Sequence, residues 1–189
     1  MRAVTAVPSD AAPVTRGDEA LLLAYQQGEA AAFAELFERY RGRAHGYALR
    51  MLRRPELAEE ACTDAFCRLL EGRWQPGGSV RSFLFTVLHR RCLELLRRRS
   101  THDRLSHKLA PEPVQPEVDD ALQLAGDQAR LRAAMDELKP EHRAVLLLYY
   151  AQELPSREVA VVLACSDQQV RSRLSYARRK LRQLLEEDR

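Results

Sequence analysis

Apolar residues along this chain recur every three or four positions, and no run alternates strictly between apolar and polar side chains as a half-buried β-strand would. Ala, Leu, Arg and Glu, which favour helices, dominate the sequence, and its 189 residues include only 8 glycines. We therefore predict an all-α fold. Because 46% of the residues are apolar and 30% are charged, the chain can bury a core, and global disorder is excluded.

Prolines and glycines divide the chain into two small helical domains. The first is predicted to span residues 18–99 and the second residues 120–189. Between them, residues 100–119 contain three prolines and lack an apolar period, which is typical of a flexible linker. Residues 1–17 contain two prolines and small side chains without periodicity, so we expect a disordered N-terminal tail.

Start and stop signals predict helices within the first domain. Gly28 is a weak point in the first predicted helix, and Pro55 suits the first turn of a later one. After a loop with three glycines, Ser79 or Ser82 can cap a helix that is expected to end in the basic run of residues 97–99.

The second domain contains a pattern typical of a helix-turn-helix. Ala160, Ala164 and Val170 have the spacing that lets two helices cross closely around a tight turn. Ser166 followed by Gln169 fits a capping box at the start of the second helix.

Charge is distributed unevenly, although the net charge is only +3. Residues 73–108 and 171–182 are predominantly basic, and residues 112–137 are predominantly acidic. Two basic segments that flank an acidic one indicate two polyanion-binding surfaces joined by a segment that avoids the polyanion.

The start of the second predicted helix carries side chains suited to reading DNA. Gln can bond adenine, Arg can bond guanine, and Ser suits a base or a phosphate, while later arginines suit phosphates. The candidates are Gln168, Gln169, Arg171, Ser172, Arg173, Tyr176, Arg178 and Arg179. The alternative interpretation is an amphipathic surface helix whose arginines are solvated.

The basic helix of the first domain has aromatic residues near its start. Aromatic rings beside a positive groove suit unstacked single-stranded bases. We predict that Trp74 is exposed for such a contact and that at least one of Phe83 and Phe85 packs in the core.

The sequence does not indicate an enzyme. It has no phosphate-binding glycine loop, metal triad or nucleophile motif, so no cofactor is expected. The four cysteines form no CxxC pair, and we interpret them as reduced thiols of a cytoplasmic protein without a metal site. No apolar stretch is long enough for membrane insertion, and no signal peptide is visible.

Three segments carry a resemblance to a known family. They are PELAEEACTDAFCRLL (residues 55–70), VRSFLFTVLHRRCLELLRRR (residues 80–99) and LKPEHRAVLLLYYAQELPSREVAVVLACSDQQVRSRLSYARRKLRQLL (residues 138–185). Together they resemble regions 2 and 4 of the extracytoplasmic-function (ECF) sigma factors of bacterial RNA polymerase. The match over residues 170–181 to V-R-S-R-L-x-x-A-R-x-x-L is the most specific.

The resemblance implies a promoter-specificity factor that binds core RNA polymerase and promoter DNA, and that an anti-sigma factor commonly holds inactive. Region 2 would bind the β′ clamp helices through Glu59, Glu60, Asp64 and Arg68. It would bind the melted −10 strand through Trp74, Arg81, Arg90, Arg91, Arg97 and Arg98. Region 4 would read the −35 element through the eight residues given above and would also meet the β flap.

The chain departs from the family pattern at Thr63, Asp64, Phe83, Arg90, Glu94, Pro155, Gln168, Gln169 and Tyr176. Gln168 and Gln169 replace the usual Gly-Thr, which predicts an unusual −35 preference. Two alternatives stay open. The departures favour a degenerate sigma-like interaction protein, and the second domain used alone would make a stand-alone helix-turn-helix regulator that binds DNA as a dimer.

Overall fold

A computed structural model describes residues 16–105 and 124–187, and every regular element in these two ranges is a helix. The elements are α1 (Asp18–Gln26), α2 (Ala30–Leu52), α3 (Pro55–Leu70), α4 (Val80–Leu105), α5 (Leu124–Glu137), α6 (Pro140–Leu146), η1 (Leu147–Ala151), α7 (Ser156–Val162) and α8 (Asp167–Glu187). The predicted all-α fold is therefore confirmed. Most of the predicted tail (residues 1–15) and of the predicted linker (residues 106–119) lies outside the described residues.

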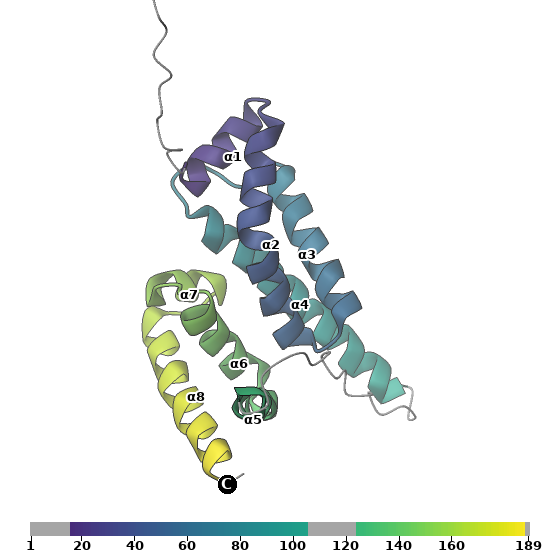
Figure 1. The fold of residues 1–189 in the computed structure, drawn as a ribbon, viewed down its shortest axis with the longest axis vertical. Coiled ribbons are helices and arrows are strands. Elements are labelled where there is room, and N and C mark those ends of the chain that lie inside the picture. Colours follow the sequence, from purple (N-terminus) through teal and green to yellow (C-terminus); the bar gives the residue numbers. More distant parts are fainter. Residues whose placement is uncertain (1–15, 106–123, 188–189) are drawn as a thin grey trace, which may run out of the picture.

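Helices α1 to α4 form the N-terminal half, residues 16–105. Helix α2 packs against α1, α3 and α4, and α4 also packs against α3 (Figure 1). Gly28 has a φ of +100°, a left-handed conformation that a glycine adopts without strain, and the chain turns there between α1 and α2. The position that was predicted to weaken the first helix therefore lies at the boundary between α1 and α2.

Local signals fix the starts of α3 and α4. Pro55 occupies the first turn of α3, where its missing N–H costs nothing. The Ser79 hydroxyl accepts a hydrogen bond of 3.1 Å from the backbone N–H of Ser82, which confirms a serine cap on α4. Helix α4 does not end at residues 97–99 as expected, but continues to Leu105.

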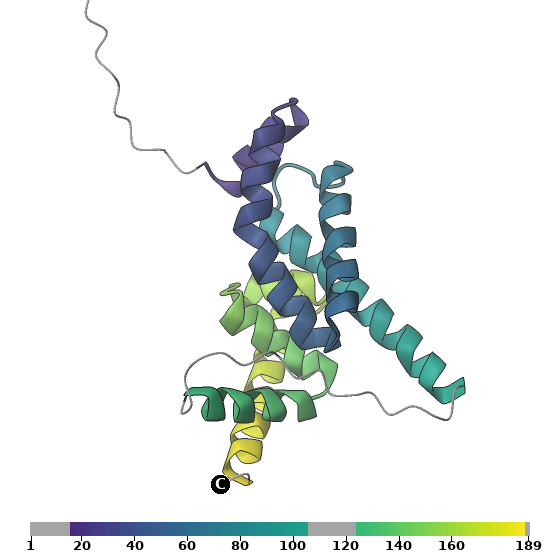
Figure 2. The same cartoon turned by 45° about the vertical axis from the view of Figure 1, so that its right-hand side comes forward.

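Helices α5 to α8 form the C-terminal half, residues 124–187. Helix α8 packs against α5, α6 and α7, and Figure 2 shows α5 crossing it. The chain between α6 and α7 forms a π-helical turn, η1, before it reaches the helix-turn-helix.

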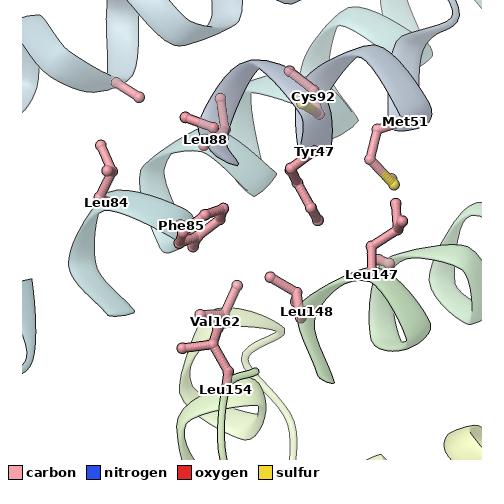
Figure 3. Packing of buried hydrophobic residues seen from close by; sticks show 14 of the residues in the cluster. Tyr47, Met51, Leu84, Phe85, Leu88, Cys92, Leu147, Leu148, Leu154 and Val162 are labelled. Carbon is pink, nitrogen blue, oxygen red and sulfur yellow. The ribbon is translucent and has the colours of Figure 1, made fainter. Parts of the chain in front are cut away.

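The two halves pack against each other. Helix α4 contacts α7, and α2 contacts α6 and η1. In Figure 3, Tyr47 and Phe85 of the N-terminal half face Leu148 and Val162 of the C-terminal half, and all four side chains are buried. A single hydrophobic cluster therefore runs through both halves.

Candidate nucleic-acid interface

Helices α7 and α8 form the predicted helix-turn-helix. Val159 and Ala160 of α7 and Val170 of α8 are buried, and the two helices pack against each other. The backbone N–H of Cys165 donates to the carbonyl of Ala160 at 3.0 Å, and Ala164 adopts a left-handed φ of +49° in the turn. This geometry fixes the direction in which α8 leaves the turn.

The predicted capping box closes the first turn of α8. The backbone N–H of Gln169 donates to the Ser166 hydroxyl at 3.1 Å, and the Gln169 side-chain oxygen accepts from the backbone N–H of Ser166 at 2.9 Å. Both partners satisfy backbone donors that a helix start leaves unpaired. Gln169 is therefore engaged in holding the helix start.

The rest of the predicted reading surface faces solvent. Its exposed members are Gln168, Gln169, Arg171, Ser172, Tyr176, Arg178 and Arg179, whereas Arg173 is half-buried. Arg171 pairs with Asp167 at 3.0 Å, and Arg173 lies 3.8 Å from Glu141 of α6. Both ion pairs are at least partly exposed to solvent and of low energy, so a phosphate or base edge can displace them.

Tyr176 lies between two other side chains on the exposed face of α8. Its ring centroid is 4.4 Å from that of His142 on α6, and the Arg179 guanidinium lies 5.6 Å from the Tyr176 ring. This stack holds Arg179 against α8 through a cation–π contact. Burial lowers the pKa of His142, with the positive charges of Lys139 and Arg173 acting in the same direction and Glu141 opposing them.

Trp74 is buried, whereas the sequence analysis predicted that it is exposed. Its side chain is only 4% exposed, and its indole N–H donates to the Gly78 carbonyl at 3.0 Å. The ring thus folds the loop before α4 onto the core instead of offering a stacking surface. Of the two phenylalanines, Phe85 is fully buried, which confirms the core prediction, and Phe83 is half-buried.

The basic residues predicted for the −10 strand occupy different environments along α4. Arg90 is exposed, and Arg98 pairs with Glu94 at 2.6 Å. Arg91 is only 17% exposed and is enclosed by Glu94 at 2.6 Å and Glu60 at 2.5 Å, which raise its pKa against the opposing effect of burial. Arg97 is exposed.

Arg81, at the start of α4, faces a carboxylate of the C-terminal half. Its guanidinium lies 3.7 Å from the carboxylate of Glu158, which belongs to α7 in the other half. A predicted −10 residue is therefore in contact with the helix-turn-helix.

The residues predicted for polymerase binding share the outer surface of α3. Glu59, Glu60 and Arg68 are exposed, and Asp64 is half-buried and pairs with Arg68 at 3.2 Å. Since Glu60 also pairs with Arg91, the α3 surface is continuous with the basic surface of α4.

A buried polar pair joins α2 to α4. The Tyr47 hydroxyl and His89 Nδ1 are 2.8 Å apart. Burial, together with the nearby charges of Arg173 and Arg90, lowers the pKa of His89 to about 4. His89 is therefore neutral at pH 7.

The cysteines of the described chain are free thiols. Burial raises the pKa of Cys62 to about 11 and that of Cys92 to about 12, so both stay protonated and unreactive at neutral pH. Cys67 is exposed and Cys165 half-buried. Within residues 16–105 and 124–187, no cluster of three or more His, Cys, Asp or Glu residues could hold a metal ion, and no helix is long and apolar enough to cross a membrane.

Sequence reasoning assigned no role to three residues that join the halves. Glu158 and Arg143 lie in the segment of residues 138–185 that resembles the family, and this resemblance was the sequence feature that could have pointed to a role for them. Arg143 is buried and donates to the carbonyls of Met135, Asp136 and Leu138, as well as to that of Arg50 in α2. Gln152 lies in the same family-like segment and is buried next to Arg43 of α2.

Two family models match the chain. Residues 36–102 match Sigma-70 region 2, and residues 128–181 match Sigma-70, region 4. The ECF RNA polymerase sigma factor SigK of Mycolicibacterium vanbaalenii is 30% identical over 178 residues, which cover 91% of this chain and 91% of SigK. The ECF RNA polymerase sigma factor SigM of Mycobacterium tuberculosis is 32% identical over 173 residues, which cover 90% of this chain and 85% of SigM.

Two solved structures share the fold. One is the sigma factor RpoE of Bartonella quintana in complex with the anti-sigma factor NepR, with a TM-score of 0.70 and 21% identity over 83% of this chain and 98% of RpoE. The other is CnrH in complex with the cytosolic domain of CnrY, with a TM-score of 0.70 and 22% identity over 91% of this chain and 99% of the matched chain.

Proposed function

Because the chain belongs to the ECF sigma factors of RNA polymerase, as its sequence predicted, we propose that its two halves divide promoter recognition between them. A sigma factor is not an enzyme: it binds core RNA polymerase and promoter DNA and directs transcription initiation. The proposal concerns which residues perform each part of this function.

The C-terminal half reads the −35 element as duplex DNA through the start of α8. The observation that carries this assignment is the exposed row of Gln168, Arg171 and Ser172 next to a first turn that the capping box holds in place. A recognition helix enters the major groove with its N-terminal residues against base edges. Gln168 can bond adenine through one amide donor and one amide acceptor, and Arg171 can bond guanine through two donors.

Of the two roles predicted for Gln169, capping and base reading, we assign it the first. Its side-chain oxygen already accepts from the Ser166 backbone N–H, so a contact of both amide atoms with adenine would have to share or break this bond. Its function is to position Gln168 and Arg171.

Later residues of α8 bind the DNA backbone. Arg178 and Arg179 are exposed beyond the first two turns, where side chains reach phosphates rather than base edges. Tyr176 orients Arg179 through the cation–π contact.

The N-terminal half binds the melted −10 strand along the basic face of α4. Arg90, Arg97 and Arg98 supply exposed positive charge, and Arg91 links this face to α3. Trp74 acts indirectly, because its buried ring fixes the loop that precedes Arg81.

Helix α3 binds core polymerase through its outer surface. Glu59, Glu60, Asp64 and Arg68 present mixed charge that suits a charged helical partner such as the β′ clamp helices. The C-terminal half additionally meets the β flap.

The protein acts in the bacterial cytoplasm, where core polymerase and chromosome are found, under the control of an anti-sigma factor. The structural relative RpoE is bound to the anti-sigma factor NepR, which supports this regulation.

Run-off transcription tests the function. Fragmented genomic DNA of the source bacterium is transcribed by purified core polymerase with this protein, without it, and with its Arg171→Ala variant. We expect discrete new transcripts that share two upstream elements, and fewer of them with the variant. Co-elution with core polymerase without new transcripts would indicate a degenerate sigma-like protein. Neither transcripts nor co-elution would indicate a stand-alone regulator.

A further inference from the structure

Helix α6 adds a titratable side chain to one flank of the recognition helix. The two helices pack against each other, with α6 alongside α8 in Figure 1. His142 lies in the first turn of α6 and is half-buried, and its ring centroid is 4.4 Å from that of Tyr176 on α8. Neither the sequence pattern nor the proposed function assigns a role to His142.

Tyr176 places His142 beside the side chains that are proposed to bind DNA. Residues three or four positions apart share one face of a helix, so Tyr176 lies on the same face as Ser172 and Arg179. All three are exposed, and the Arg179 guanidinium lies 5.6 Å from the Tyr176 ring. His142 therefore adjoins the DNA-binding face of α8 from a neighbouring helix.

The dimensions of DNA place a phosphate backbone next to such a flank. The major groove of B-DNA is about 12 Å wide, and a helix with its side chains is about 10–12 Å across. A recognition helix in the groove therefore has base edges in front of it and a phosphate backbone along each flank. His142 lies on one of these flanks.

Positive charge predominates around His142. Lys139 and Glu141 at the start of α6 and Arg173 of α8 all act on the ring electrostatically, and Glu141 lies 3.8 Å from Arg173. Arg179 of α8 adds a further positive charge on the same flank. These groups comprise three cations and one carboxylate, so the patch that they form attracts a phosphate.

The other elements near α6 add little to this patch. Arg143, the next residue of α6, is buried and donates to backbone carbonyls. Beside it, Arg53 of α2 and Asp136 of α5 pair at 2.8 Å, and an ion pair adds no net charge. The π-helical turn η1 contributes Tyr149 and Tyr150, whose rings meet edge to face. The net charge that faces the histidine therefore comes from the start of α6 and from α8.

We propose that His142 is a proton-dependent contact to the phosphate backbone on one side of the −35 element, and that binding of this element takes up a proton at the imidazole. This inference rests on the proposed function. A protonated imidazole has two N–H donors and a positive charge, and both suit a phosphate oxygen. The contact extends the −35 interface from α8 to α6.

The environment of His142 gives the direction of the pH effect. In the free protein its pKa lies below the ordinary value of 6.5; burial is the largest cause, Glu141 opposes it, and Lys139 and Arg173 add to it. A bound phosphate favours the charged ring and raises this pKa. Between the two values the complex binds more protons than the free protein, so DNA binding must tighten as the pH falls through this window.

Two substitutions at this position separate charge from packing. His142→Asn keeps a polar side chain that does not titrate, whereas His142→Arg carries a permanent positive charge. His45→Asn is the matched control, because His45 is also half-buried but lies on α2 in the N-terminal half. Circular dichroism checks that each variant is folded.

Promoter binding by the holoenzyme tests the proposal. The holoenzyme is formed from core polymerase and the full chain, and the probe is a labelled promoter duplex identified by run-off transcription. Titrations at several pH values between about 6 and 8, each at several salt concentrations, give the apparent dissociation constant.

We expect His142→Asn to bind more weakly than the wild type by a ratio that grows roughly threefold to tenfold from pH 8 to pH 6, because only the wild type gains a proton. The control His45→Asn should follow the wild type, and His142→Arg should bind tightly over the whole range. Near pH 6, the slope of log affinity against log salt concentration should be shallower by about 0.9 in His142→Asn, which corresponds to one phosphate contact fewer.

The other outcomes overturn the proposal. A constant ratio between His142→Asn and the wild type means that no proton is taken up at this residue. An unchanged salt slope, or a folded His142→Arg that binds as weakly as His142→Asn, means that His142 only packs against Tyr176. If the wild type forms no holoenzyme or binds no promoter, the proposed function itself fails, and this failure is seen without any variant.

Discussion

At the scale of single residues, the side chain of Gln169 caps the start of α8, which is a different task from contacting a base. Its oxygen accepts from the backbone N–H of Ser166, and its own backbone N–H donates to the Ser166 hydroxyl. A glutamate can make the same contact, because capping boxes use either residue type. An alanine cannot.

Gln169→Ala should lower the free energy of unfolding by roughly 0.5–1 kcal/mol, whereas Gln169→Glu should leave it nearly unchanged, because only the alanine removes the cap. Urea denaturation followed by circular dichroism measures both variants. If Gln169→Glu is as unstable as Gln169→Ala, the side chain does not act as a cap.

Arg171 is assigned to a base edge. Arg171→Ala should reduce discrimination at one base pair of the −35 element by roughly 1–3 kcal/mol, because a bidentate arginine contact distinguishes guanine from other bases. Competition binding against all single-base variants of the element measures this loss. Equal weakening on every sequence would assign Arg171 to a phosphate instead.

His89 makes stability depend on pH. Its pKa in the folded protein is about 4 because burial disfavours the charged ring, while the ordinary value is 6.5. Between these two values the unfolded chain binds more protons, so stability must fall as the pH drops through this window. The loss between pH 7 and pH 4.5 should be about 2 kcal/mol.

Urea denaturation at both pH values measures this difference in the wild type and in His89→Asn. Asparagine can hydrogen-bond to the Tyr47 hydroxyl in place of Nδ1, but it does not titrate. The variant should lose about 2 kcal/mol less than the wild type over the same range. Identical losses in both proteins would show that other groups cause the pH dependence.

Some residue roles could be predicted from the sequence and others could not. The box of Ser166 and Gln169 depends only on a three-residue spacing, so the pattern was sufficient. The burial of Trp74 depends on its hydrogen bond to Gly78 and on how the loop folds against the core, and composition around the residue contains no information about either. The role of Glu158 depends on a partner more than seventy positions away in the chain.

At the scale of elements, the turn between α7 and α8 contains a strained residue. Ala164 has a φ of +49°, which costs a residue with a Cβ roughly 1 kcal/mol and costs glycine almost nothing. Glycine also loses more backbone entropy on folding than alanine does. The net gain in the free energy of unfolding is therefore smaller than the strain energy that the substitution relieves.

Ala164→Gly should therefore raise the free energy of unfolding by up to about 1 kcal/mol, through relief of the left-handed strain. The matched control is Ala133→Gly on the exposed face of α5, which should lower it by about 1 kcal/mol, since glycine is unfavourable within a helix. Thermal unfolding of both variants gives the signs. A loss of stability in both would mean that the turn at Ala164 is not strained.

Helix starts were more predictable than helix ends. Pro55, Ser79 and Ser166 act through local chemistry, and each lies where the pattern predicted a start. The continuation of α4 to Leu105 was missed because the basic run at residues 97–99 contains good helix formers, and nothing in it obliges a helix to stop. The π-helical turn η1 has no sequence signature.

At the scale of the whole molecule, one cluster of buried side chains spans both halves. Sequence periodicity predicted an all-α fold, but it could not predict that Tyr47, Phe85 and Leu148 pack together. An apolar side chain that faces its own domain and one that faces the other domain have the same helical spacing.

The shared cluster should make the halves unfold together. Leu148→Ala removes a fully buried side chain from the C-terminal half and should cost roughly 2–5 kcal/mol. Trp74, the single tryptophan of the chain, lies in the N-terminal half, so its fluorescence reports on that half alone. Its unfolding midpoint should shift together with the circular dichroism signal.

Leu131→Ala provides the comparison, because Leu131 is 43% exposed and the same truncation there should change the midpoint little. A Trp74 transition that stays in place in Leu148→Ala, while the circular dichroism transition splits, would show that the halves unfold independently.

The C-terminal half presents opposite faces to its two sets of contacts. Gln168, Arg171 and Ser172 lie on its solvent side, whereas Glu158 and Leu148 lie against the N-terminal half. Natural selection can therefore change the residues of one face without changing those of the other. Substitutions on the inner face change how firmly the two halves pack together, and substitutions on the outer face change which promoters the factor reads. Paralogues that diverge from such a protein can acquire new stabilities and new regulons as separate heritable traits.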